Sequence, residues 1–163
     1  MKFGTVPQEP ARQHTLEVCA PQFADAVTAT LLDLRNAGFD PIVYETLRTP
    51  DRQSWLAGFG RDYDDGRGIV THALEVWTTW HGFALGADII SESKDWGASD
   101  EFWVALGDAA ERHGLAWGGR WKMRDLPHIQ PAVCRTTPSG HAKALYDSGG
   151  YPAVWAAIYG EGI

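Results

Sequence analysis

Four side chains have the types and spacing to form a catalytic metal site, namely His81, Asp88, Asp125 and His128. A catalytic zinc ion needs three protein ligands, commonly imidazole or carboxylate, and an open fourth position for water. His81 and Asp88 stand seven residues apart, and His128 lies far along the chain. Two histidines and one aspartate would leave a net charge of about +1 on zinc, enough to acidify a bound water strongly. His and Asp at this spacing also occur by chance, so spacing alone makes zinc a hypothesis.

Asp125 and His128 form an Asp-x-x-His unit that contains Pro127. In a regular strand, residues three apart face opposite sides. Pro127 disfavours a regular strand, and a kink there can bring both side chains to one side. Asp125 would then lie beside the metal rather than on it, as a general base and later a general acid.

The other histidines have simpler interpretations. His14 lies in a polar N-terminal segment, and His141 begins a late helix. His113 falls in the last turn of a predicted helix, where a partial positive charge meets the helix dipole favourably. His72 precedes the first metal motif by nine residues, so a place in the cleft stays open as an alternative.

Hydrophobic periodicity and helix-breaking residues predict the elements that position these groups. From Pro21, apolar residues recur at spacings of three and four, which predicts a helix ending before Gly38. Residues 41–48 predict a strand, and residues 51–60 predict a second helix. The polar, Gly-rich stretch 61–68 predicts a surface loop; it lacks the full EF-hand pattern, so a calcium loop is disfavoured. Its position also leaves open a flap that faces the substrate.

The remainder of the chain continues to interleave helices and short strands. The predicted segments are a short helix at 71–80, a strand at 87–90, a helix at 100–113, a turn at 117–121, an extended segment at 127–131 and two closing helices from residue 139. The strands are too few and too short for a doubly wound parallel sheet. We therefore expect a small α+β fold, with residues 1–163 as one domain and residues 1–15 as an irregular lead-in.

Composition excludes several classes of partner. The 163 residues carry a formal net charge of −7, which argues against nucleic-acid binding and against docking on anionic lipid. No apolar stretch is long enough to span a bilayer, and no signal peptide is visible at the N-terminus. Cys19 and Cys134 have no CxxC spacing, and we interpret them as small buried hydrophobes.

Three segments together resemble a known family of cell-wall peptidases. They are YETLRTPDRQ (44–53), WHGFALGAD (80–88) and FWVALGDAAERHGLAWGGRWKMRDLPHIQ (102–130). In this order they are similar to the zinc D-Ala-D-Ala carboxypeptidase / L-alanyl-D-glutamate endopeptidase family, which includes phage endolysins. The resemblance covers roughly residues 20 to 160. It implies a hedgehog-like domain with a small antiparallel sheet flanked by helices.

The resemblance implies a role for each matched residue. His81, Asp88 and His128 would bind one Zn²⁺, and Asp125 would move a proton from the attacking water to the leaving amine. Arg48 would polarise the scissile carbonyl or hold the substrate. Arg52 and Gln53 match as supporting residues. Trp80 and Trp121 flank the metal motifs. Core packing is the slightly favoured interpretation of both, and walls of a substrate groove are the alternative.

The implied function is hydrolysis of peptidoglycan stem peptides, most similar to cleavage of the L-Ala-D-Glu bond by phage lysis enzymes. D-Ala-D-Ala carboxypeptidase or dipeptidase activity is the nearest alternative. The family's first motif, S-x-H-x-x-G-x-A-x-D, is altered to Thr79, Ala84 and Gly86. This alteration motivates a second alternative, a non-catalytic zinc-binding wall or phage structural module. We expect a monomer, made in the bacterial cytoplasm from a phage or prophage gene and acting at the wall after release.

Overall fold

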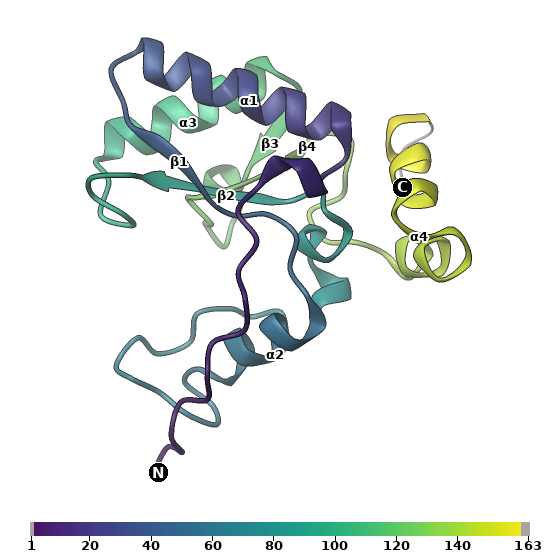
Figure 1. Cartoon of the computed structure of the whole chain (residues 1–163). Helices are drawn as coiled ribbons and strands as arrows, with labels where there is room; N and C mark the ends of the chain where they lie inside the picture. The colour runs from purple at the N-terminus through teal and green to yellow at the C-terminus, as the bar shows by residue number, and fades with distance from the viewer. Residues whose placement is uncertain (1, 161–163) are drawn as a thin grey trace.

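A computed structural model describes residues 2–160 and shows an α+β fold (Figure 1). The helices are α1 (Pro21–Asn36), α2 (Pro50–Gly58), α3 (Asp100–Arg112) and α4 (Gly140–Gly160). The strands are β1 (Pro41–Glu45), β2 (Ala87–Ser91), β3 (Leu115–Trp117) and β4 (His128–Pro131). Four 3-10 turns complete the order: η1 (Leu16–Val18), η2 (Val76–Thr78), η3 (Trp80–Phe83) and η4 (Gly118–Arg120).

The four strands form one antiparallel sheet in the order β1-β2-β4-β3. Helices α1 and α3 pack against each other over one face of this sheet (Figure 1). Ile89 and Ile129 are fully buried in the core with Leu106 of α3. The small antiparallel sheet flanked by helices is therefore confirmed.

The register of the sheet creates a row of polar side chains. Glu45 of β1 pairs with Asp88 of β2, and Asp88 pairs with His128 of β4. Residues directly opposite each other in antiparallel strands point to the same face. Three side chains far apart in the sequence are thus placed side by side.

Helix ends follow local sequence signals. Pro21 begins α1, and Gly38 follows it with a φ of 91°, a left-handed conformation that glycine adopts without strain. The Thr49 side chain accepts a hydrogen bond from the Arg52 amide and caps α2, with Pro50 at the first helical position. Ser99 caps α3 in the same way.

Two predicted elements were wrong in extent. The strand expected at 41–48 ends at Glu45, because the Thr46 amide donates to Gln13 of the N-terminal segment instead of to β2. The helix expected at 71–80 is replaced by η2 and the start of η3. There the Thr78 and Thr79 hydroxyls donate to nearby carbonyls, which competes with a regular helix.

The remaining elements match more closely, with one omission. Helix α4 contains a non-helical Gly150 followed by Pro152, so its two halves correspond to the two predicted closing helices. Strand β3 was not predicted; it has only three residues and depends on pairing with β4. Cys19 and Cys134 are free and buried, as expected.

The N-terminal segment before η1 is irregular, yet it is tied to the rest of the fold. The Trp55 indole donates to the Pro7 carbonyl at 3.0 Å, and Arg52 contacts Glu9 at 2.9 Å. Across residues 2–160, no helix combines the length and apolar character needed to cross a bilayer.

Candidate metal centre

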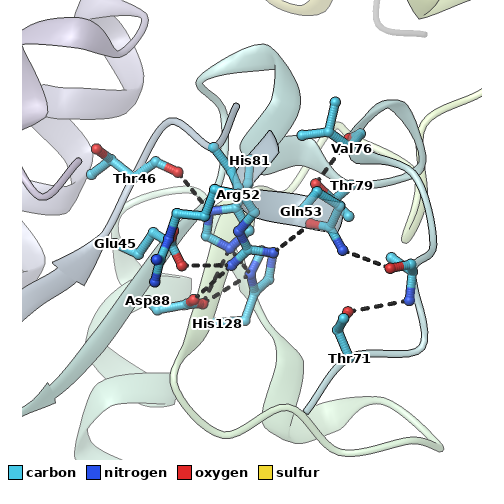
Figure 2. Close-up of polar contacts among 12 residues, drawn as sticks. Glu45, Thr46, Arg52, Gln53, Thr71, Val76, Thr79, His81, Asp88 and His128 are labelled. Carbon is cyan, nitrogen blue, oxygen red and sulfur yellow. Dashed lines mark hydrogen bonds and ion pairs between the residues drawn. The ribbon is translucent and has the colours of Figure 1, made fainter. Parts of the chain in front are cut away.

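His81, Asp88 and His128 converge on one point, as Figure 2 shows. His81 Nε2 lies 3.2 Å from His128 Nδ1, and each nitrogen lies 3.3 Å from Asp88 Oδ1. All three residues are at most 8% exposed. The three atoms form a nearly equilateral triangle of possible metal ligands.

The His81 ring is held in one tautomer. Its Nδ1 lies 2.7 Å from the Thr46 carbonyl, which can only accept a hydrogen bond. Nδ1 must therefore carry the proton, and Nε2 presents its lone pair to the centre. The backbone is fixed too, because the Arg48 amide donates to the His81 carbonyl at 3.0 Å.

The His128 ring is held by a second chain of hydrogen bonds. Gln130 Nε2 donates to the Arg135 carbonyl at 2.9 Å, so Gln130 Oε1 faces His128 Nε2, also at 2.9 Å. His128 Nε2 must then donate, and Nδ1 turns its lone pair toward His81 and Asp88. Outer hydrogen bonds of this kind are the usual support of metal-binding histidines.

The triangle fits a tetrahedral zinc ion. With zinc–nitrogen bonds of 2.0–2.1 Å, ligand atoms in a tetrahedron lie about 3.3 Å apart. The lone pairs of the two imidazoles and the Asp88 carboxylate, all at this separation, also favour a positive charge between them. Burial by itself would lower the pKa of His128, but the hydrogen bond that its protonated ring donates to Asp88 and the charges of Asp125 and Asp88 raise it. The donor set therefore suits a cation.

Asp88 divides its two oxygens between the histidines and Arg48. Oδ1 faces the imidazoles, while Oδ2 lies 3.5 Å from Arg48 Nη2. Burial alone would raise the pKa of Asp88, but the charges and hydrogen bonds of the two histidines in their protonated form hold it well below its usual range. Asp88 therefore stays ionised at neutral pH.

Arg48 is buried at the edge of the centre. Its Nη2 donates to Glu45 at 2.8 Å and its Nη1 donates to Gln53 at 2.9 Å. Gln53 in turn donates to the Ala73 carbonyl, and Glu45 also accepts from Arg52 (Figure 2). Among the described residues, Arg48 Nε is the buried side-chain atom left without a hydrogen-bond partner. Burial and these hydrogen bonds fix the guanidinium in place.

Asp125 lies in a tight turn just before β4. The His128 amide donates to the Asp125 carbonyl at 3.2 Å, which is the kink expected at Pro127. The Asp125 amide donates to Gly118, where a Cβ would stand 2.4 Å from the Asp125 carbonyl oxygen. Glycine at position 118 therefore allows the Asp125 turn to pack closely against the backbone there.

The pKa of Asp125 is raised from its usual value. Its side chain is exposed on one side, but burial of the carboxyl by the surrounding protein raises the pKa, and the negative charge of Asp88 adds to this. The charges of His128, His81 and Arg48 act in the opposite direction. A carboxyl with a raised pKa next to a metal site suits proton transfer.

The altered first motif exchanges two small residues, Ala84 and Gly86, close to the ligands. Ala84, where the family has glycine, adopts a left-handed conformation with φ 57°. This conformation costs about 1–2 kcal/mol for a residue with a Cβ. At Gly86, an added Cβ would lie 3.0 Å from the His81 amide nitrogen and 3.1 Å from His128 Cε1. Glycine there leaves room for both histidine rings.

The two tryptophans expected at a groove differ in position. Trp80 is 1% exposed and donates to the Arg135 carbonyl at 2.7 Å, so its interpretation as a groove wall was wrong. Its large apolar ring packs with Phe83 in the core. Trp121 is half-buried, with its ring centroid 5.4 Å from that of His128. It borders the metal centre.

Several residues of the site were not singled out from the sequence. Glu45 and Gln130 support Arg48 and His128, and both lie within the motifs of the resemblance. Arg52 and Gln53 lie where supporting residues were expected. His72 is exposed, and the described contacts do not connect it to the centre. His113 lies 2.9 Å from Asp33 of α1.

Comparisons with known proteins agree with this geometry. Residues 71–131 match the family described as D-alanyl-D-alanine carboxypeptidase. The chain is 31% identical over 123 residues to the peptidoglycan L-alanyl-D-glutamate endopeptidase CwlK of Bacillus subtilis, covering 67% of this chain and 69% of that protein.

Two solved structures share the fold. The L-Ala D-Glu endopeptidase ChiX of Serratia marcescens has a TM-score of 0.52 at 21% identity, over 71% of this chain and 82% of that chain. The vancomycin resistance D,D-pentapeptidase VanY, in complex with Zn(II), also has a TM-score of 0.52, at 16% identity, over 81% of this chain and 79% of that chain. At such identities the likeness concerns the fold alone. Together with the match to CwlK, it leads to one conclusion: the chain belongs to the family of D-alanyl-D-alanine carboxypeptidases and L-alanyl-D-glutamate endopeptidases.

Proposed function

We propose that the chain is a zinc-dependent peptidase that hydrolyses the stem peptide of bacterial peptidoglycan. The observation that carries the proposal is the triangle of His81 Nε2, Asp88 Oδ1 and His128 Nδ1, with sides of 3.2–3.3 Å, beside a carboxyl of raised pKa. The names of the relatives agree: CwlK acts on peptidoglycan, and VanY was solved with Zn(II).

His81, Asp88 and His128 would hold the zinc ion. When bound, zinc supplies Lewis acidity and lowers the pKa of a water in its open position. The hydrogen bonds from His81 to Thr46 and from His128 to Gln130 keep both imidazoles aimed at the metal.

Asp125 would accept the proton of the attacking water and pass it to the departing nitrogen. Its carboxyl is not one of the three candidate ligands, so it is free for this task. A purely structural zinc site would usually be closed by a fourth protein ligand. A nearby acid outside the ligand set therefore favours catalysis over the non-catalytic module.

Arg48 would stabilise the oxyanion that forms on the scissile carbonyl. Its guanidinium is held by Glu45, Gln53 and Asp88 at the edge of the metal centre. A fixed donor that needs no reorganisation during the reaction is effective at stabilising developing charge. Trp121, beside His128, would border the bound peptide.

The L-Ala-D-Glu bond is the preferred target, because the chain is 31% identical to CwlK, an L-alanyl-D-glutamate endopeptidase. Removal of a terminal D-Ala is the alternative, given the family description. We also propose that the chain acts as a monomer, as a single domain.

The test is a digest of purified peptidoglycan with zinc-loaded protein, analysed by mass spectrometry for new peptide ends. A chelated sample and Asp125→Ala run beside it. New D-Glu amino termini that are absent from both controls would support the endopeptidase, and loss of terminal D-Ala would support the carboxypeptidase. Asp125→Ala should keep its zinc and lose about 10²- to 10⁴-fold in kcat. If peptidoglycan of several wall types gave no new peptide ends although the protein held zinc, the proposal would be rejected.

A further inference from the structure

A pocket of about 340 Å³ opens beside Asp125, and no residue of the buried arginine network lines it. Its lining residues are Trp96, Trp103, Arg124, Asp125, Leu126 and Pro127. The segment that follows β2 contributes Trp96, α3 contributes Trp103, and the turn before β4 contributes the others. The pocket thus shares the Asp125 turn with the metal centre.

The proposed reaction predicts which part of the substrate enters this pocket. Asp125 delivers a proton to the nitrogen that leaves, so the residue carrying that nitrogen lies on the Asp125 side of the scissile bond. The part of the substrate that enters the pocket is therefore the leaving residue.

Arg124 is the cation that lines the pocket. Its one hydrogen bond within residues 2–160 runs from Nε to the Gly119 carbonyl at 3.3 Å, and no ion pair engages it there. Arg120, four residues earlier, is instead paired with Asp108 and Glu111 of α3. A guanidinium without a carboxylate partner, in a chain of net charge −7, is suited to an anion from another molecule.

Two tryptophans supply apolar surface around this cation. Trp103 is 4% exposed, whereas Trp96 is 52% exposed and packs edge-on against Tyr44 with centroids 4.8 Å apart. The exposed Trp96 can cover the carbon atoms of a small residue whose charged group lies against Arg124.

We propose that this pocket binds the leaving residue and that Arg124 pairs with the free α-carboxylate of that residue. The inference rests on the proposed function. It holds for both candidate bonds: D-Glu in a stem peptide is linked onward through its side chain, and a terminal D-Ala has no following residue. In each case an unblocked carboxylate sits one carbon from the departing nitrogen.

The experiment compares paired synthetic stem peptides that differ only at the leaving residue, which carries either a free α-carboxylate or the neutral carboxamide. Initial rates give kcat and KM for the zinc-loaded wild type, Arg124→Gln and Arg124→Lys. Arg120→Gln is the matched control, since its guanidinium is already paired on the outside of α3. Both bonds are tested, each with its own peptide pair.

We expect the wild type to prefer the carboxylate by about tenfold in kcat/KM, as for one charge-assisted contact. Arg124→Gln should lose this preference through a raised KM with little change in kcat, because the contact exists before and during the reaction. Arg124→Lys should keep part of it, and Arg120→Gln all of it.

Two outcomes would overturn the inference while leaving the proposed function intact. One is a wild type that cleaves both peptides of a pair equally well, and the other is Arg124→Gln with the full wild-type preference. A wild type that cleaves none of the peptides would count against the proposed function itself, so the two failures are distinguishable.

Discussion

The two sides of Asp125 are built differently. On one side, Glu45, Arg48, His81, Asp88 and His128 are at most 8% exposed and are joined by hydrogen bonds to one another and to backbone carbonyls. On the other side, Trp96 and Arg124 are exposed, and Arg124 makes a single hydrogen bond within the described chain.

The difference matches two physical requirements. Metal ligands and an oxyanion donor must be held close to their productive geometry, and buried hydrogen-bond networks hold side chains in this way. A subsite that recognises part of the substrate must be open to solvent before the substrate arrives. We therefore expect substitutions on the buried side to affect metal binding or folding, and those on the open side to affect KM.

The largest effect is expected from loss of a metal ligand. His128→Ala should weaken zinc binding by more than the roughly 10- to 100-fold that supporting residues contribute, and hydrolysis should disappear with it. Zinc content after dialysis and a competition titration measure the change. The exposed His141→Ala is the control. Wild-type zinc content in His128→Ala would exclude His128 as a ligand.

The next largest effects are expected from two tryptophans, Trp80 for the buried side and Trp96 for the open side. Trp80→Ala should lower the free energy of unfolding by about 3–5 kcal/mol, because it removes a buried ring and the hydrogen bond that this ring donates to the Arg135 carbonyl. Trp96→Ala should leave stability nearly unchanged and raise KM. Denaturant titrations and steady-state kinetics separate the two results. Equal losses of stability would mean that the open side is as tightly packed as the buried one.

Gln130 tests whether the support of His128 is needed. Gln130→Leu removes the acceptor for His128 Nε2, so the ring loses its fixed tautomer and zinc affinity should fall by about 10- to 100-fold. The exposed Gln22→Leu, with the same change of side chain, should bind zinc like the wild type. An unchanged zinc affinity in folded Gln130→Leu would show that the ring needs no such partner.

The smallest effect is expected from Asp40, which anchors the segment leading to Trp96. Its carboxylate accepts hydrogen bonds from the Ser91 hydroxyl at 2.6 Å and the Ser93 amide at 2.8 Å. These hydrogen bonds, from Ser91 first, lower the pKa of Asp40 from 3.8 to about 2.

A carboxyl whose pKa is lower in the folded state stabilises the fold above its unfolded pKa and loses that contribution as pH falls through the folded value. Asp40→Asn should therefore be less stable than the wild type at neutral pH, and the difference should shrink between about pH 4 and pH 2. Unfolding midpoints across this range measure it. A difference that stays constant with pH would mean that the ionised carboxylate is not what holds the segment.

The sequence alone was enough to place the candidate ligands and much of the secondary structure. His81, Asp88 and His128 stand in a spacing and an order of motifs that are specific when taken together. Pro21 marks a helix start through local chemistry that does not depend on the rest of the fold, and the caps Thr49 and Ser99, although not singled out from the sequence, are equally local. Such signals lie within a few residues of what they determine, so they can be recognised without a structure.

The tertiary structure decided everything that depends on pairing between distant segments. The register of β1, β2 and β4 places Glu45, Asp88 and His128 in one row, and a shift by one residue would turn a side chain to the opposite face. The burial of Trp80, its hydrogen bond to the Arg135 carbonyl and the three-residue β3 depend on segments brought together only by folding. The pocket beside Asp125 has the same origin, because its walls come from three separate parts of the chain.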